Sequence, residues 1–372
     1  MVIAVNTRLL QEGSANITWY VHFFVQWAAA QPQHQFVFIT HQPNQPQLPP
    51  NLPNLQLQVL PQQSRRPLLW KWWYNYKLPA LLRSIKADIV FHPDMVCSLR
   101  TKLPQGIFIN TTPHEAQAWL EKNYSHYIQA NTYRFIQKAA LLIVPVSNLQ
   151  KDITKSHPAT ASKIVIVPPY PIPATGAATW EQRQETKERY AAGKEYFLFI
   201  SPLHNGSNFI HLLKAFSFFK KRQKSNMQLV ILAPQLPPKN KFITSLQTYK
   251  YRHDVQLLQH KDANMQQHLL SAAYAMVQPT LYDDAPLLLQ AMQCGVPVIA
   301  AENATVKELL EDTVLYCDKT NFNSTAQLMM HLYKDETART MLIEAARKHS
   351  SAFTLDTTLS TMVNTLPASG KK

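Results

Sequence analysis

A short acidic turn in the last third of the chain carries side chains that can bind hydroxyl groups. Asp283 and Asp284 precede Ala285-Pro286, and Gln290 follows on the expected helix. Carboxylate and amide oxygens accept hydrogen bonds, so these residue types can hold the hydroxyl groups of a ligand. A structural interpretation also explains one Asp, because Asp before a Pro near the first helical position makes a good N-cap.

The surrounding segment, Gln278 to Ala301, contains the elements that must position this turn. Its pattern predicts a strand end, the acidic turn, a short helix, a glycine turn and a buried strand. Gly295 is expected to serve the turn between helix and strand, which is a structural role.

Apolar strand-like segments alternate with helix-like segments twice along the chain. The expected strands are 2–5, 36–39, 55–60, 88–91, 107–109, 141–146 and 163–167, and then 196–200, 228–232, 255–258, 275–278 and 297–300. This alternation predicts an α/β protein with two doubly wound parallel sheets, and the short apolar strands fit sheets covered on both faces. Such sheets bind ligands at the carboxyl ends of their strands, so we expect the site in a cleft between two facing domains.

The alternation also predicts the domain boundaries. The N-terminal domain is expected at 1–168, a Pro-rich linker at 169–194 and the second domain at 195–351. A chain of 372 residues is long enough for two domains of ordinary size.

Composition limits the class of partner. The chain is 46% hydrophobic and 16% charged, with a net charge of +14. This charge favours anionic partners, namely nucleotide sugars, phospholipid surfaces or nucleic acid, although it could also serve solubility alone. The 7 glycines are far fewer than the roughly 26 that average usage of about 7% would give. Close approach of the backbone to phosphate is therefore less favoured than in most nucleotide-binding folds.

The three cysteines, Cys97, Cys294 and Cys317, are too few and too widely spaced for a disulfide framework or a zinc site. They fit a reduced, cytoplasmic protein. The first residues lack the apolar region of a signal peptide, and no apolar run approaches the roughly 18–20 residues of a membrane span. We therefore expect any membrane contact to be peripheral, at the inner face.

Several segments resemble the GT-B glycosyltransferases of family 4, also described as glycosyl transferase group 1. They are Ile3–Leu10, Ala140–Ile153, Tyr196–His204, Asn208–Phe216 and Gln278–Ala301. The resemblance spans nearly the whole chain and implies two Rossmann-like domains, the first on the acceptor side and the second binding the nucleotide-sugar donor. It also implies that a C-terminal segment, about 352–372, crosses back to the first domain.

The resemblance assigns donor-binding roles in the second domain, with departures from the family pattern. Ser207 stands where the family has a Lys that holds the donor diphosphate, and Gly206 where many relatives have Arg. Losing one such donor typically costs about 2.7–4 kcal/mol of barrier. His204, as an imidazolium, and Asn205, through its amide, are candidate replacements, although a packing role for His204 is the simpler interpretation. Asn208 completes the donor loop.

The acidic turn departs from the family pattern in a similar way. Asp283 and Gln290 replace two Glu residues of the family, and the loop is one residue shorter. By resemblance Asp283 is the candidate catalytic residue, which would accept hydrogen bonds from donor-sugar hydroxyls. Asp284 and Gln290 are candidate donor-binding residues, with Gln290 placed to bond a ribose hydroxyl.

On the acceptor side the resemblance points to Asn110, Thr111 and His114, where relatives place a His-Asp pair near the reacting sugar. Glu115 matches an acidic position of close relatives and is the second candidate catalytic residue, or else a solvated residue at a helix start. The Gly-x-Gly turn of relatives is replaced by Asn16-Ile-Thr-Trp19.

The segment Trp70-Lys-Trp-Trp-Tyr-Asn-Tyr-Lys77 allows a nucleic-acid or membrane interpretation, since aromatic side chains stack on bases and sit at lipid interfaces. Trp72, Tyr76 and their neighbours recur at helical spacing, however, so we expect most of them in the core.

Two functions remain open from the sequence. The first is a retaining glycosyltransferase that moves a hexose from a nucleotide sugar, such as a UDP- or GDP-hexose, to a glycan, lipid-linked or small-molecule acceptor. The second is a degenerate GT-B protein that binds a glycan, a nucleotide or a partner protein without turnover. Nucleic-acid binding is a distant third. No metal or other cofactor is expected, because the 14 histidines are scattered and the family chemistry does not usually need one.

Overall fold

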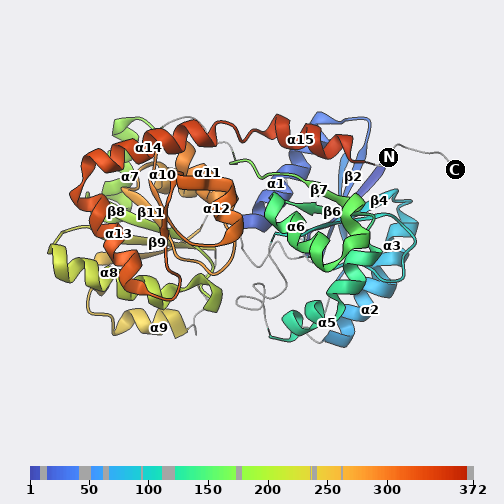
Figure 1. Ribbon diagram of the computed structural model, residues 1–372, viewed down its shortest axis with the longest axis horizontal. Coiled ribbons are helices and arrows are strands. Elements are labelled where there is room, and N and C mark those ends of the chain that lie inside the picture. Colours follow the sequence, from blue (N-terminus) through green and yellow to red (C-terminus); the bar gives the residue numbers. More distant parts are fainter. Residues whose placement is uncertain are drawn as a thin grey trace. The chain divides into compact units, whose positions relative to one another are not determined.

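The computed structural model describes most of the chain (Figure 1). The described residues are 1–8, 15–41, 52–61, 67–93, 95–110, 122–172, 178–234, 236, 241–260 and 263–366. They form two compact units. The first contains the described residues up to Pro169, apart from Ala15 and Asn16, together with those from Leu355 onward, and the second contains residues from Tyr170 to Thr354.

The first unit is built on a seven-stranded parallel sheet with the order β3-β2-β1-β4-β5-β6-β7. Its strands are β1 (Val2–Asn6), β2 (Gln35–Thr40), β3 (Leu55–Val59), β4 (Ile89–His92), β5 (Gln105–Phe108), β6 (Leu141–Val144) and β7 (Ile164–Ile166). Its helices are α1 (Ala15–Ala30), α2 (Pro67–Trp72), a π-helical turn η2 (Trp73–Lys77), α3 (Leu78–Ser84), α5 (Lys122–Lys138), α6 (Ser147–Ser156), the 3₁₀ turn η3 (Pro158–Lys163) and α15 (Leu355–Asn364). The hydroxyl of Thr358 on α15 donates to the carbonyl of Pro168 at 3.0 Å, which fastens the end of the chain to this unit.

The second unit is built on a six-stranded parallel sheet with the order β10-β9-β8-β11-β12-β13. Its strands are β8 (Tyr196–Ile200), β9 (Gln228–Ala233), β10 (Val255–Gln259), β11 (Ala275–Gln278), β12 (Val298–Ala301) and β13 (Leu315–Cys317). Its helices are α7 (Trp180–Ala191), α8 (Phe209–Gln223), α9 (Lys241–Gln247), α10 (Ala263–Ser271), α11 (Ala285–Gln293), α12 (Ala304–Leu310), α13 (Phe322–Lys334) and α14 (Glu336–Ser350), with 3₁₀ turns at Asn205–Ser207, Arg252–Asp254 and Glu311–Thr313. The residues expected as a linker thus include α7, which contacts α10 and β9.

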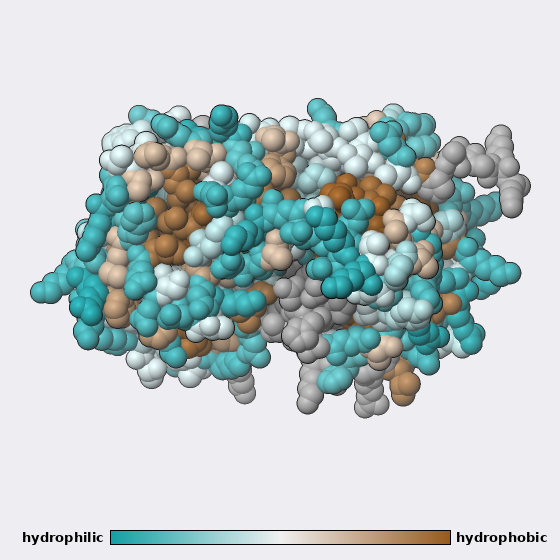
Figure 2. Space-filling model, viewed as in Figure 1, coloured by the Kyte–Doolittle hydropathy of each residue, from teal (hydrophilic) through white to brown (hydrophobic). Residues whose placement is uncertain are grey.

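Burial explains why these strands are short and apolar. Every residue of β8, β9, β11 and β12 is buried, so helices cover both faces of the sheet. Hydrophilic residues cover most of the face shown in Figure 2. In both units the strand order reverses once, as in doubly wound α/β folds, which confirms the predicted fold class.

Gly295 ends α11 in the way the sequence predicted. Its φ of +72° is left-handed, and an added Cβ would collide with the Arg347 guanidinium. The N–H groups of Gly295 and Val296 donate to the carbonyls of Met292 and Ala291, both at 3.0 Å. This is a Schellman motif, which directs the chain straight into β12.

Candidate functional site

Two polar loops of the second unit meet where its strand order reverses. Between β8 and β11 the sheet changes direction, because β9 lies beyond β8 and β12 beyond β11. The loop 201–208 follows β8 and the loop 279–284 follows β11, so both leave the carboxyl ends of adjacent strands. Open parallel sheets bind ligands at this point. The predicted donor-side residues all lie on these loops or on α11.

Backbone and amide hydrogen bonds fasten the two loops to each other. The Leu281 N–H donates to the Gly206 carbonyl at 2.8 Å. The Asn208 amide donates to the Pro279 carbonyl at 3.0 Å and to the Lys319 carbonyl at 2.9 Å. Asn208 therefore links the loop after β8 to the loops that contain Pro279 and Lys319. Its backbone occupies the left-handed region, with φ of 54°.

Asp284 points into the protein. Its Oδ2 accepts hydrogen bonds from Gln278 Nε2 at 2.8 Å and from the Thr280 hydroxyl at 3.2 Å. Burial is the main cause that raises the pKa of this carboxyl to about 7, and the nearby Asp283 adds to the rise. At neutral pH Asp284 is thus partly protonated, and its hydrogen bonds hold β11 and the acidic turn together.

Asp283 accepts a hydrogen bond at the start of α11, and Asp284 does not. The Asp283 Oδ1 accepts the Ala285 N–H at 2.7 Å, whereas Asp284, which occupies the N-cap position, makes no capping hydrogen bond with its side chain. The side-chain N-cap expected from one Asp is therefore absent, and the local bond to the first N–H of the helix comes from the residue that the family resemblance also singles out.

Gln290 lies in the second turn of α11 and is buried. Its Oε1 accepts from Gln266 Nε2 on α10 at 3.3 Å. The amide oxygen proposed to bind a ribose hydroxyl is therefore already hydrogen-bonded within the unit.

His204 is not a cation at neutral pH. Burial lowers the pKa of its imidazole to about 4, and its ring packs against Tyr282 with centroids 5.4 Å apart. Burial therefore disfavours the charged His204 that the sequence suggested as a replacement for the family Lys. Among the described residues, Nδ1 of His204 has no hydrogen-bond partner, so a neutral imidazole still has one nitrogen to offer.

Ser207 is fully buried and its hydroxyl donates to the His204 carbonyl at 2.6 Å, so it shapes the loop. Asn205, in contrast, is exposed at the tip of the loop. Its Oδ1 accepts a hydrogen bond from the ammonium of Lys241 at 2.6 Å. Lys241 is the first residue of α9 and is exposed.

Lys241 was not among the residues predicted from the sequence, because it follows β9 rather than β8. A signal for it exists, because β9 is the sheet neighbour of β8 and their carboxyl-end loops must lie side by side. A lysine at the start of the helix after β9 was therefore a candidate for this loop.

On the other unit, only one predicted acceptor-side residue can be placed. Asn110 follows β5, is half-buried and accepts a hydrogen bond from the Tyr20 hydroxyl. Thr111, His114 and Glu115 lie outside the described residues.

The first unit has its own polar cluster where its strand order reverses. The Asn6 amide, at the end of β1, lies 3.4 Å from both the Tyr74 hydroxyl and His92 Nδ1. Arg8 is buried and its Nε donates to the same hydroxyl at 3.3 Å. The sequence does not predict this cluster, because its members come from three distant segments.

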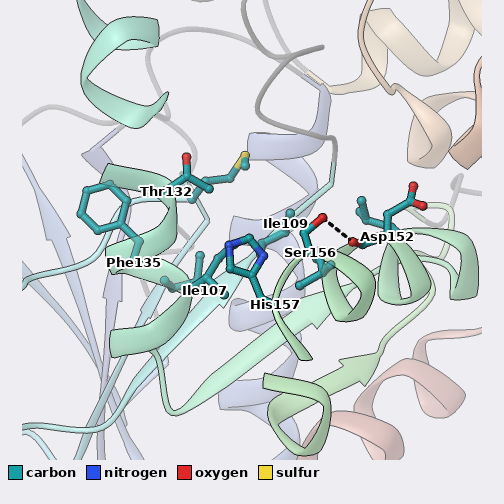
Figure 3. Close-up of a pocket in the computed structure, with 11 residues that line it drawn as sticks. Ile107, Ile109, Thr132, Phe135, Asp152, Ser156 and His157 are labelled. Carbon is teal, nitrogen blue, oxygen red and sulfur yellow. Dashed lines mark hydrogen bonds between the residues drawn. The ribbon is translucent and has the colours of Figure 1, made fainter. Parts of the chain in front are cut away.

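A separate cavity of about 140 Å³ lies among β5, α5 and α6 of the first unit (Figure 3). Ile107, Phe135 and Ile153 are among its apolar walls, and His157 stands at its side. Such walls suit an apolar group and not a phosphate, so the cavity is distinct in chemistry from the polar loops.

Two further features concern metals and membranes. Within the described ranges, no three His, Cys, Asp or Glu side chains gather closely enough to hold a metal ion. No helix in the part of the chain that the structure describes is long and apolar enough to cross a bilayer.

A comparison with models of protein families gave two matches. Residues 17–170 match the model described as Glycosyltransferase Family 4, and residues 181–349 match the model described as Glycosyl transferases group 1. The second match includes both polar loops and α11. The chain belongs to the family 4-like GT-B glycosyltransferases.

Solved structures agree with this GT-B assignment over the whole chain. Sucrose-phosphate synthase from Thermosynechococcus elongatus is 15% identical with a TM-score of 0.79, covering 98% of each chain. WaaG, a glycosyltransferase involved in lipopolysaccharide biosynthesis, is 15% identical with a TM-score of 0.76, covering 100% of each chain. Anabaena HepE in complex with UDP-glucose is 13% identical with a TM-score of 0.75, covering 98% of this chain and 99% of HepE. A comparison with curated protein sequences gave no significant match.

Proposed function

We propose that this GT-B glycosyltransferase transfers a hexose from a nucleotide sugar to a glycan, lipid-linked or small-molecule acceptor, with retention of anomeric configuration. The observation that carries the proposal is the pair of polar loops at the strand reversal of the second unit, with an exposed ammonium at their edge. The structural likeness to HepE, which was solved with UDP-glucose, supports a nucleotide-sugar donor. The proposed reaction requires no metal or other cofactor.

In this reaction the bond between the anomeric carbon and the diphosphate oxygen breaks, and the anomeric carbon bonds to the acceptor oxygen on the same face. The acceptor proton passes to the diphosphate, which leaves. Negative charge therefore grows on the diphosphate, and a fixed cation stabilises it.

We assign this cation to Lys241. Ser207 is neutral and turned inward, and burial keeps the pKa of His204 near 4, so neither supplies charge. The Lys241 ammonium reaches the exposed tip of the same loop at Asn205. A lysine from α9 would thus do what the family Lys does from the loop after β8.

The acidic turn has a second role in the proposal. Asp283 is buried at the start of α11, where its Oδ1 accepts the Ala285 N–H, and its carboxylate is the candidate to accept hydrogen bonds from donor-sugar hydroxyls. Glu115, Asn110 and His114 stay candidates for the acceptor side, and contact with a membrane would be peripheral.

Calorimetric titration with UDP, GDP and their sugar conjugates tests the proposal, followed by a transfer assay with the nucleotide that binds. We expect Lys241→Ala to weaken diphosphate binding about tenfold, since hydrogen bonds to charged groups are worth about 1.5–3 kcal/mol before solvent screening. Lys241→Arg should restore most of the affinity.

Lys250→Ala is the matched control, because it removes the same charge from the same region. Lys241 lies 5.0 Å over the ring of Phe242, and Lys250 lies 5.4 Å over the ring of Tyr251. Equal losses in both variants would contradict the role of Lys241. No heat with any nucleotide, from folded wild-type protein, would contradict the transferase proposal itself and favour a binding scaffold.

A further inference from the structure

In the helical segment α2–η2 of the first unit, some aromatic side chains are buried and others face solvent. Trp70, Trp73 and Tyr74 are buried, as the sequence predicted for most of this run. Trp72 and Tyr76, however, are each 47% exposed. The two residues named as core from their spacing are thus the two that face solvent.

Aliphatic residues extend this exposed side. Leu68 is 79% exposed and Leu69 is 41% exposed, one turn before Trp72. An isolated exposed leucine is ordinary, but four large apolar side chains on a single short helical segment form a patch.

Cations surround the patch. The Lys77 ammonium lies 4.8 Å over the ring of Trp72, and the Arg100 guanidinium lies 4.3 Å over the ring of Tyr76. Lys71, which precedes Trp72 in α2, is also exposed. The sequence contains no Asp or Glu from residue 13 to residue 87, so no acidic side chain of this stretch offsets these charges.

We propose that this aromatic–basic face, formed by Leu68, Leu69, Lys71, Trp72, Tyr76, Lys77 and Arg100, binds the surface of an anionic lipid bilayer. Leucine side chains enter the acyl boundary, Trp and Tyr sit at the headgroup level, and Lys and Arg attract anionic headgroups. This surface goes beyond the proposed sugar transfer and does not depend on it.

The charge pattern favours a lipid surface over a second copy of the chain and over a nucleic acid. A symmetric contact with a second copy would press two faces of the same positive charge together, and like charges across an interface repel. A nucleic acid would pair with the cations but would leave the exposed leucines in water. A lipid surface satisfies the apolar and the basic side chains together.

Sedimentation with vesicles tests the proposal on the full chain. Vesicles of phosphatidylcholine with one quarter phosphatidylglycerol should carry the protein down, and vesicles of phosphatidylcholine alone should carry much less. Binding should fall as salt rises, because salt screens the headgroup charge.

Two variants separate the apolar from the basic contribution. Leu68→Ser with Trp72→Ser should weaken binding about a hundredfold or more, since burial of such side chains is worth about 1.5–3 kcal/mol each. Lys77→Gln with Arg100→Gln should weaken it about fivefold for each cation, at roughly 1 kcal/mol per charge.

Matched controls on the second unit should bind as wild type does. Trp180 is 69% exposed, so Trp180→Ser removes an equally exposed ring. Lys250→Gln with Arg222→Gln removes one Lys and one Arg that also lie over aromatic rings, those of Tyr251 and Phe218.

Three results would overturn the proposal. The first is absence of vesicle binding by the wild-type protein. The second is equal loss in the control variants, which would assign binding to the overall charge of +14. The third is a concentration-dependent dimer in analytical ultracentrifugation that Leu68→Ser with Trp72→Ser abolishes, which would assign the face to a second copy.

Discussion

The side chains of the polar loops after β8 and β11 are bonded within the fold, whereas those of the aromatic–basic face of α2–η2 project away from it. The loops are held by hydrogen bonds from Asn208, Gln278 and Thr280, so the residues that shape the candidate site also stabilise the unit. The side chains of the aromatic–basic face project into solvent, while their buried neighbours Trp70 and Trp73 hold the helix in place. Changes in the loops should therefore alter stability and binding together, whereas changes on the face should alter binding alone.

The largest effect expected in the loops is the pH dependence that Asp284 brings to them. Its pKa is about 7 in the folded protein and near 3.9 when unfolded, so the folded state binds the proton more tightly. Its contribution is full below about pH 4 and is lost as pH rises through about 7. Asp284→Asn should therefore gain stability relative to wild type, by up to about 4 kcal/mol, between these pH values.

Chemical denaturation of both proteins at several pH values from 4.5 to 8 measures this difference. Titration of all other groups cancels in the comparison of the two proteins. A difference between them that does not change with pH would show that Asp284 is ionised throughout, and that the loops are held differently.

Asn208→Ala should have the next largest effect. It removes two amide hydrogen bonds, to the carbonyls of Pro279 and Lys319, and places Ala in the left-handed region. We expect a loss of about 2–3 kcal/mol in the free energy of unfolding, together with weaker nucleotide binding.

Asn208→Gly separates the two causes, because glycine tolerates the positive φ but lacks the amide. If the Gly variant were as stable as wild type, the hydrogen bonds would contribute nothing and the tie between the loops would be incidental.

The smallest effect should come from the face itself. Trp72→Ala loses a cation–π contact with Lys77 at an exposed site, which is worth about 0.5–1 kcal/mol. Its thermal unfolding should therefore stay close to that of wild type. The adjacent Trp73→Ala should cost about 3–5 kcal/mol, since Trp73 is 1% exposed. Similar losses for the two variants would remove the contrast between face and core.

The sequence alone determined the fold and the family of this protein. Short apolar strands that alternate with helices leave few arrangements except buried parallel sheets, and Gly295 after a helix predicts the turn that the structure contains. These features depend on neighbours in sequence, which a pattern records directly. The positions of the two polar loops followed from the same rule, because the carboxyl ends of adjacent parallel strands meet at one edge.

Only the tertiary structure decided the contacts, burial and charge of the candidate side chains. Asp283 accepts the first N–H of α11 while Asp284 turns inward, because Gln278 and Thr280 lie behind the turn. Burial against Tyr282 and its surroundings leaves His204 neutral, and Lys241 reaches Asn205 from 36 residues away. Helical spacing could not tell Trp72 from Trp73, since a π-helical turn begins between them and the neighbouring elements decide which face is covered. Contacts between distant segments set burial and charge, and these are the quantities on which the chemistry of the site depends.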